Sequence, residues 1–147
     1  MKYTERQIGW IVIVPALGIL VLLLIFYINQ WGNNPISYSG LLIMSTIFII
    51  SLLLFFQMRT SVDNKKIRIS YGIGLIKKII DIHNIERIEI VRNKWYYGLG
   101  IRIIKNGWLY NIQGLNAIEL KMKNSKSIIR IGTVDNKKLK KEIESKI

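Results

Sequence analysis

Two long apolar runs, separated by a short polar connector, constrain this chain of 147 residues more than any other feature. Residues 8–28 and residues 39–58 contain no charged side chain. A helix rises about 1.5 Å per residue, so each run can cross the roughly 30 Å hydrocarbon layer of a bilayer. The connector, residues 29–38, is short and polar, which favours a turn between antiparallel helices. The sequence therefore predicts a transmembrane helical hairpin.

The remainder of the chain is long enough for one small core and no second domain. We therefore expect two parts. Residues 1–58 form an N-terminal tail and two transmembrane helices (8–28 and 39–58), and residues 59–147 form a cytoplasmic domain. Residues 59–64 are interpreted as a short tether that keeps residues 65–68 within reach of lipid headgroups.

The charge of the chain is concentrated after the hairpin. Residues 59–147 carry 20 Lys and Arg against eight Asp and Glu, a net charge of +12. Such an excess indicates retention of cations on the cytoplasmic side first, an anionic lipid surface second and nucleic acid last. Because the chain has no cysteine, disulfides, zinc thiolate sites and thiol catalysis are excluded.

The distribution of cations also predicts the orientation of the hairpin. Lys2 and Arg6 precede it, a cluster beginning at Arg59 follows it, and the connector carries no charge. Cytoplasmic segments are enriched in Lys and Arg, so both termini are expected in the cytoplasm of a two-pass protein of the cell (inner) membrane. The first run is too long for a signal peptide and lacks a cleavage site before Asn29.

After the hairpin the apolar residues alternate with polar ones, which is typical of half-buried strands. Seven strands are predicted, over residues 66–71, 75–82, 86–91, 99–103, 108–112, 118–123 and 127–131. Asn106-Gly107 predicts a type I′ hairpin turn, and Asn124-Ser125-Lys126 a polar turn. Thr133 or Asp135 can cap a terminal helix whose apolar face is Leu139, Ile143 and Ile147. Seven strands and one helix predict a small open barrel closed at one end by the helix, in the all-β or α+β class.

Four short blocks in the second half of the domain resemble the bacterial pleckstrin-homology-like (PH-like) domains that follow one or two transmembrane helices. The blocks are Gly98-Leu99-Gly100-Ile101-Arg102, Gly107-Trp108-Leu109-Tyr110-Asn111 with Gly114, Ala117-Ile118-Glu119-Leu120, and Arg130-Ile131-Gly132-Thr133. This resemblance implies a PH-like fold and membrane-associated binding or scaffolding instead of a reaction.

Pleckstrin-homology domains that bind phosphoinositides use basic residues around their first two strands. By this resemblance the candidate contacts for anionic lipid or a partner are Lys65, Lys66, Arg68, Lys77 and Lys78. The loop between these two strands, residues 71–75, carries no charge, so nonspecific attraction to anionic lipid is expected more than recognition of one headgroup.

Other candidate sites have simpler interpretations. Asp81 with His83 can be a general-base pair, but a solvated turn histidine is favoured, and one histidine does not support a metal site. Gly72-x-Gly74 and Gly98-x-Gly100 are turn glycines, so no cofactor is expected. The aromatic segment 95–97, flanked by Arg92 and Lys94, is favoured as an interfacial or packed loop over a nucleic-acid patch.

The sequence thus predicts a non-enzymatic membrane protein whose PH-like module binds a protein partner or an anionic membrane surface. The alternative is an accessory subunit of a larger membrane complex that contacts its partners through the hairpin. An enzyme acting through Asp81 and His83 is the least favoured hypothesis, and the oligomeric state is left open.

Overall fold

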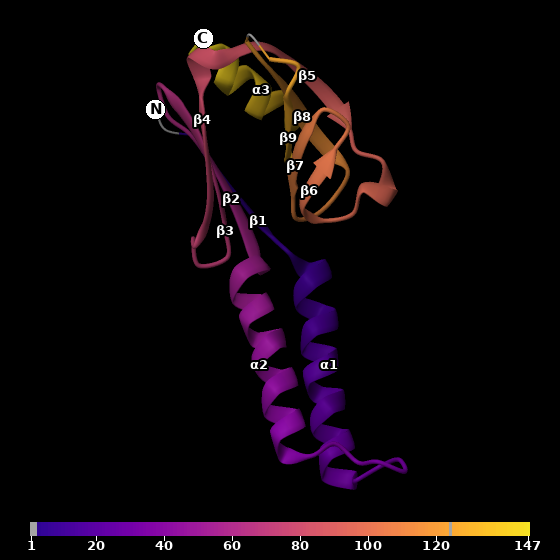
Figure 1. Cartoon of the computed structure of the whole chain (residues 1–147). Helices are drawn as coiled ribbons and strands as arrows, with labels where there is room; N and C mark the ends of the chain where they lie inside the picture. The colour runs from indigo at the N-terminus through magenta and orange to yellow at the C-terminus, as the bar shows by residue number, and fades with distance from the viewer. Residues whose placement is uncertain (1–2, 124) are drawn as a thin grey trace.

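A computed structural model describes residues 3–123 and 125–147, and shows a helical hairpin that leads directly into a β-rich domain (Figure 1). Helix α1 (Trp10–Asn29) and helix α2 (Tyr38–Phe55) lie side by side. Met1, Lys2 and Asn124 lie outside the described residues, and with them the first predicted flanking cation and part of one predicted turn.

Both helices are long and apolar enough to cross a membrane. Among their residues only Ala16, Leu23 and Leu41 are buried, so the hairpin presents an apolar surface along its length and is not a core element of the domain. Helix α2 ends three residues before the predicted end of the second span, because the chain enters a strand at Gln57.

A four-stranded antiparallel sheet continues upward from the helices (Figure 1). Its strands are β1 (Tyr3–Ile8), β2 (Gln57–Val62), β3 (Lys66–Tyr71) and β4 (Ile76–Asp81), in that order across the sheet. β1 and β2 pair along their whole length, from Tyr3 opposite Val62 to Ile8 opposite Gln57. The structure therefore corrects three expectations: residues 3–7 are not a free tail, Ile8 belongs to β1 and not to the first span, and residues 59–62 are not part of a tether.

The second sheet has five strands in the order β5-β8-β9-β7-β6. The strands are β5 (Ile85–Arg92), β6 (Gly100–Ile104), β7 (Gly107–Asn111), β8 (Asn116–Met122) and β9 (Ile128–Gly132), with short 3-10 helices at η1 (Ile82–Asn84) and η2 (Trp95–Tyr97). The seven predicted strands correspond to β3 through β9. However, the described residues form nine strands in two sheets that do not close, which corrects the seven-stranded open barrel.

The β6–β7 hairpin turns one residue earlier than predicted. Ile104 lies opposite Gly107, so the turn residues are Lys105 and Asn106, and of these Asn106 has a positive φ of 66°. Gly107 is needed for another reason: a Cβ atom there would overlap the carbonyl oxygen of Ile128. This close approach occurs where β7 pairs with β9 in parallel.

One apolar core joins the inner faces of both sheets. Met58 and Ile69 contribute from the first sheet and Leu120 from the second. Helix α3 (Asn136–Glu144) packs on β5 and β8, with Leu139 and Ile143 fully buried. The Asp135 side chain caps this helix by accepting a hydrogen bond from the Lys138 amide at 2.9 Å. Ile147, predicted on the same apolar face, follows the helix and is 58% exposed.

The hairpin and the first sheet are joined by close backbone contacts. The Gly9 amide donates to the Phe56 carbonyl at 2.9 Å, which ties the start of α1 to the end of α2. The Ile73 amide donates to the Leu53 carbonyl at 3.1 Å, so the β3–β4 turn lies against the last turn of α2. A Cβ at Gly72 would overlap the same Leu53 oxygen, which explains the glycine at this position.

Candidate functional site

The structure places the five predicted contact residues at different heights and on two faces of the four-stranded sheet. Lys65 lies in the β2–β3 turn, Lys66 and Arg68 are in β3, and Lys77 and Lys78 are in β4. Lys66 and Arg68 alternate with buried residues, and Lys77 with half-buried ones, so all three point to the outer, exposed face. Lys78 lies opposite the buried Ile69, so it belongs to the other face.

Two arginines that were predicted only as charges flanking the hairpin complete this outer face. Arg6 of β1 lies directly opposite Arg59 of β2. Arg59 lies opposite Ser70 of β3, and Ser70 lies opposite Lys77 of β4. The register therefore places Arg6, Arg59 and Lys77 in one row across all four strands. We call this row with Arg68 and Lys66 the basic face.

The cations of the basic face stand at increasing heights above the helices. β2 leaves α2 at residue 56 and rises about 3.3 Å per residue, so the row containing Arg59 lies about 10 Å from the end of the helix. The row of Arg68 is about 17 Å away and that of Lys66 about 23 Å, from the same rise. Residues 65 and 66 are thus at the end of the sheet remote from the helices, contrary to the expectation that they lie near lipid headgroups.

Few carboxylates offset the charge of the basic face. Arg68 pairs with Asp63 at 4.0 Å, and both side chains are about half exposed, at 50% and 48%. Exposed pairs of this kind contribute little energy. Asp81 lies opposite Lys66 at the remote end of the face. The row of Arg6, Arg59 and Lys77 contains no acidic residue.

Glu5 holds the N-terminal strand, and so Arg6, in place. Its carboxylate accepts hydrogen bonds from the Tyr3 hydroxyl at 2.8 Å, the Thr133 hydroxyl at 2.6 Å and the Val134 amide at 2.9 Å. It also accepts a bond from the side chain of Gln7 at 2.8 Å. Burial, and secondly the hydrogen bond from the Tyr3 hydroxyl to Glu5, raise the pKa of Tyr3 well above its ordinary value. Glu5 therefore joins β1 to the segment between β9 and α3.

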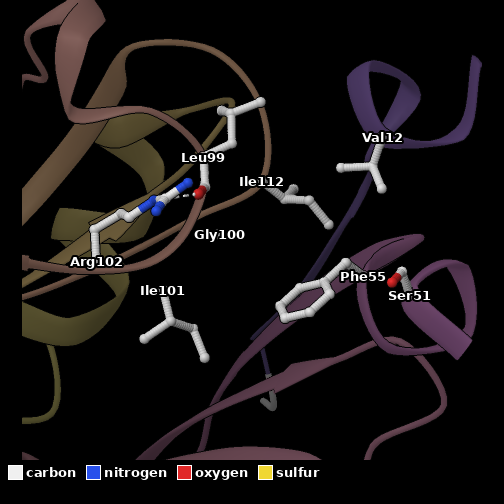
Figure 2. Close-up of a pocket in the computed structure, with 8 residues that line it drawn as sticks. All are labelled: Val12, Ser51, Phe55, Leu99, Gly100, Ile101, Arg102 and Ile112. Atoms are coloured by element: carbon white, nitrogen blue, oxygen red, sulfur yellow. Dashed lines mark hydrogen bonds between the residues drawn. The ribbon is translucent and has the colours of Figure 1, made fainter. Parts of the chain in front are cut away.

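A cavity of about 390 Å³ lies between the helices and the lower end of the five-stranded sheet (Figure 2). Val12, Ser51 and Phe55 line it from the helix side, and residues 99–102 and Ile112 from the sheet side. In Figure 2 the Arg102 guanidinium points toward the backbone of Leu99, and its Nε donates to the Leu99 carbonyl at 2.9 Å. This apolar cavity with one cation had no signal in the sequence, because its walls come from four separate segments.

The aromatic segment η2 is partly built into the domain. Arg130 lies over the Tyr97 ring at 5.7 Å and pairs with Glu119 at 2.6 Å. In contrast, Trp95 is 82% exposed and lines a second hollow together with Ile11 of the first turn of α1. One end of the segment is thus packed, and the other lies near the start of the hairpin.

The Asp81 side chain contacts the backbone of His83. The Asp81 carboxylate accepts a hydrogen bond from the His83 backbone amide at 3.0 Å and caps the 3-10 helix η1. Within residues 3–123 and 125–147, no group of three His, Cys, Asp or Glu side chains is arranged to hold a metal ion.

Comparison of the chain with protein-family models, with curated proteins and with solved structures finds no match.

Proposed function

We propose that this protein is a two-pass membrane protein whose β-rich domain, a PH-like module, docks an acidic surface of a protein partner beside the membrane. The basic face carries the proposal, because it gathers Arg6, Arg59, Lys66, Arg68 and Lys77 on one exposed side of a single sheet. Basic surfaces steer acidic partners and fix their orientation.

The orientation of the sheet favours a protein partner for most of this face. β1 and β2 continue the direction of the helices, so the basic face stands upright and looks sideways (Figure 1). Only its lowest row is near headgroups, whereas Arg68 and Lys66 stand about 17 and 23 Å from the helix end. A partner that is itself at the membrane can contact all three levels.

The lowest row supports a second role, nonspecific attraction to anionic lipid. Arg6, Arg59 and Lys77 stand about 10 Å from the end of α2, which is about one Debye length at roughly 0.1 M salt. Each cation at such a surface contributes about 1 kcal/mol. Lys65 and Lys66 are too far away to share this role.

The pairing of β1 with β2 supports the proposed orientation, because it requires both flanks of the hairpin on one side of the membrane. The excess of cations on these flanks favours the cytoplasm. Protease added outside intact cells is expected to leave the C-terminal domain whole, and its removal would contradict the orientation.

The PH-like identity is supported by the succession of seven strands, β3 to β9, followed by helix α3. We propose binding instead of catalysis because the Asp81 carboxylate is occupied by a backbone amide, not by the imidazole of His83. The alternative role is contact with partner subunits through the hairpin. It is tested by photocrosslinking from probes placed in α1.

The test of partner docking uses a single photoreactive probe in the full-length protein in native membranes. Because the chain has no cysteine, a cysteine at Ser61, which lies opposite Arg68 on the basic face, can be labelled alone. We expect a discrete adduct that is lost in Arg68→Glu and retained in the control Arg87→Glu on β5. A probe at Glu86 should give no such adduct. An adduct insensitive to Arg68→Glu, or no adduct at Ser61, would overturn the proposal.

The lipid role is tested separately with a fluorophore on a cysteine at Ser70, between Arg59 and Lys77. The labelled protein is reconstituted in nanodiscs of neutral or of anionic phospholipid. We expect a salt-sensitive shift of emission in the anionic discs that Arg59→Gln reduces. Equal emission in both discs would remove this role.

A further inference from the structure

We propose that the cavity between the hairpin and the five-stranded sheet, the junction cavity, binds the phosphate and glycerol portion of one anionic phospholipid. The inference relies on the membrane placement proposed above but not on the basic face. Its lining residues are Val12, Ser51 and Phe55 from the helices and, across from them, residues 99–102 with Ile112 (Figure 2).

The position of the cavity selects a lipid as its occupant. Val12 is in the first turn of α1 and Phe55 is the last residue of α2, so the helical wall lies at the ends of both apolar spans. This is the level at which acyl chains give way to headgroups in a bilayer. The five-stranded sheet overhangs α1 at this level (Figure 1), and the cavity lies between the two.

The lining of the cavity is complementary to the part of a phospholipid that lies at that depth, where the headgroup meets the acyl chains. Phe55, Ile101 and Ile112 supply apolar walls, and Arg102 supplies one cation at the sheet side. None of the described residues that line the cavity is acidic. The charge of Arg102 therefore complements a phosphate, and the walls complement the glycerol and the first carbons of the acyl chains.

Arg102 is held in a geometry suited to a phosphate. Its Nε donates to the Leu99 carbonyl at 2.9 Å, which fixes the guanidinium plane and leaves the two terminal nitrogens for an anion. None of the ion pairs formed by the described part of the chain involves Arg102. Paired donors of arginine bind phosphate oxygens in a bidentate manner.

The size of the cavity limits which part of a phospholipid it can bind. About 390 Å³ is within the range of small-molecule sites and too small for a whole phospholipid. The acyl chains therefore remain along the exposed apolar surface of α1 and α2. Trp95, 82% exposed beside Ile11 in the adjacent hollow, provides a ring of the type that favours the interfacial region.

Native mass spectrometry of the full-length protein tests this site directly. The protein is released from nanodiscs that contain equal amounts of phosphatidylglycerol and phosphatidylcholine, and the retained lipids are counted. We expect one phosphatidylglycerol retained by the unmodified protein, and roughly tenfold less in Arg102→Gln, the loss typical of a hydrogen bond to a charged group. Ile101→Trp, which fills the cavity without changing charge, should lose the same lipid.

Two controls make the result decisive. Arg87→Gln removes an exposed arginine of β5 and should retain the lipid. Arg102→Lys keeps the charge but not the paired donors and should retain an intermediate amount. Retention of phosphatidylglycerol by Arg102→Gln at the level of the unmodified protein would overturn the proposal, as would equal retention of both lipids. Unfolding temperatures confirm that each variant is folded.

Discussion

The five-stranded sheet contains a partly buried ion pair, whereas the cations on the outer face of the four-stranded sheet are exposed. Glu119 and Arg130 pair across β8 and β9 at 2.6 Å, with side chains only 20% and 19% exposed. Along the outer face of the first sheet, the corresponding pair within the described residues is Arg68 with Asp63, at 4.0 Å and half exposed.

The second sheet thus contains charges that are paired within the fold. The first sheet presents its cations to solvent or to a binding partner. Partly buried pairs stabilise the fold, because their hydrogen bonds replace lost hydration. Cations left in water along one face repel one another and are useful only toward an anionic surface. The proposed docking of a protein partner therefore belongs to the first sheet, and the second sheet provides the scaffold together with Arg102 of the junction cavity.

The largest effect is expected from the glycines at the close contacts of each sheet. Gly107→Ala places a Cβ on the Ile128 carbonyl and should lower the free energy of unfolding by about 3 kcal/mol, by separating β7 from β9. Gly72→Ala should cost a similar amount, because it meets the Leu53 carbonyl and a φ of 54°. Thermal unfolding in nanodiscs measures both.

Gly18→Ala is the control for these two variants, since a Cβ at Gly18 has no atom within 4 Å. Its unfolding temperature should equal that of the unmodified protein or exceed it. If Gly107→Ala were as stable as this control, the parallel pairing of β7 with β9 would be wrong.

The next effect tests how the first sheet is attached to the second. Glu5→Ala removes four accepted hydrogen bonds, including those from Thr133 and Val134, and should cost about 2 kcal/mol. Limited proteolysis should also release β1 more readily. The matched control is Glu86→Ala, which breaks only an exposed pair with Lys121 at 3.5 Å and should cost less than about 1 kcal/mol.

Double-mutant cycles measure the contrast between the two sheets itself. The Glu119–Arg130 cycle should give a coupling free energy of about 1.5 kcal/mol, as expected of a partly buried charged hydrogen bond. The Asp63–Arg68 cycle should give less than about 0.5 kcal/mol. Equal couplings would remove the distinction between scaffold and docking sheet.

The smallest effect at neutral pH is expected from Tyr71, which links the sheets by donating from its hydroxyl to the Asn111 carbonyl at 3.3 Å. Burial raises the pKa of Tyr71 above its ordinary value. The folded state therefore keeps the proton when the unfolded state releases it, and this stability is present below pH about 10 and is lost as the pH rises further.

Tyr71→Phe should accordingly cost about 1 kcal/mol at pH 7 and lose less stability than the unmodified protein above pH about 10. Unfolding temperatures across this range provide the measurement. A Tyr71→Phe profile that matches the unmodified one would contradict the assigned burial effect.

Most of strands β3 to β9 were predictable because apolar and polar residues alternate over a half-buried surface, and β4 and β7 because turn residues precede them. β1 was not, since two of the side chains that it turns inward are Glu5 and Gln7. Their partners are Thr133, Val134 and the Gly132 carbonyl, which are more than 120 residues away. β2 was hidden because it follows the second span without a break.

The candidate site was predicted only in part, because strand alternation shows which residues of one strand share a face but not which distant strands pair. Lys66, Arg68 and Lys77 share a face that strand alternation already indicates, but Lys78 is on the opposite face. Arg6 and Arg59 are more than 50 residues apart in sequence and adjacent in the sheet. No local pattern shows that two flanking cations belong to one row.

By itself the sequence determined the two apolar spans, the alternation of seven strands, the capped terminal helix and the basic excess, because each depends on neighbouring residues alone. The tertiary structure decided the pairing of β1 with β2, the parallel pairing of β7 with β9, the row of cations and the junction cavity. These depend on hydrogen bonds and close approaches between distant segments, whose partners are known only once the chain is folded.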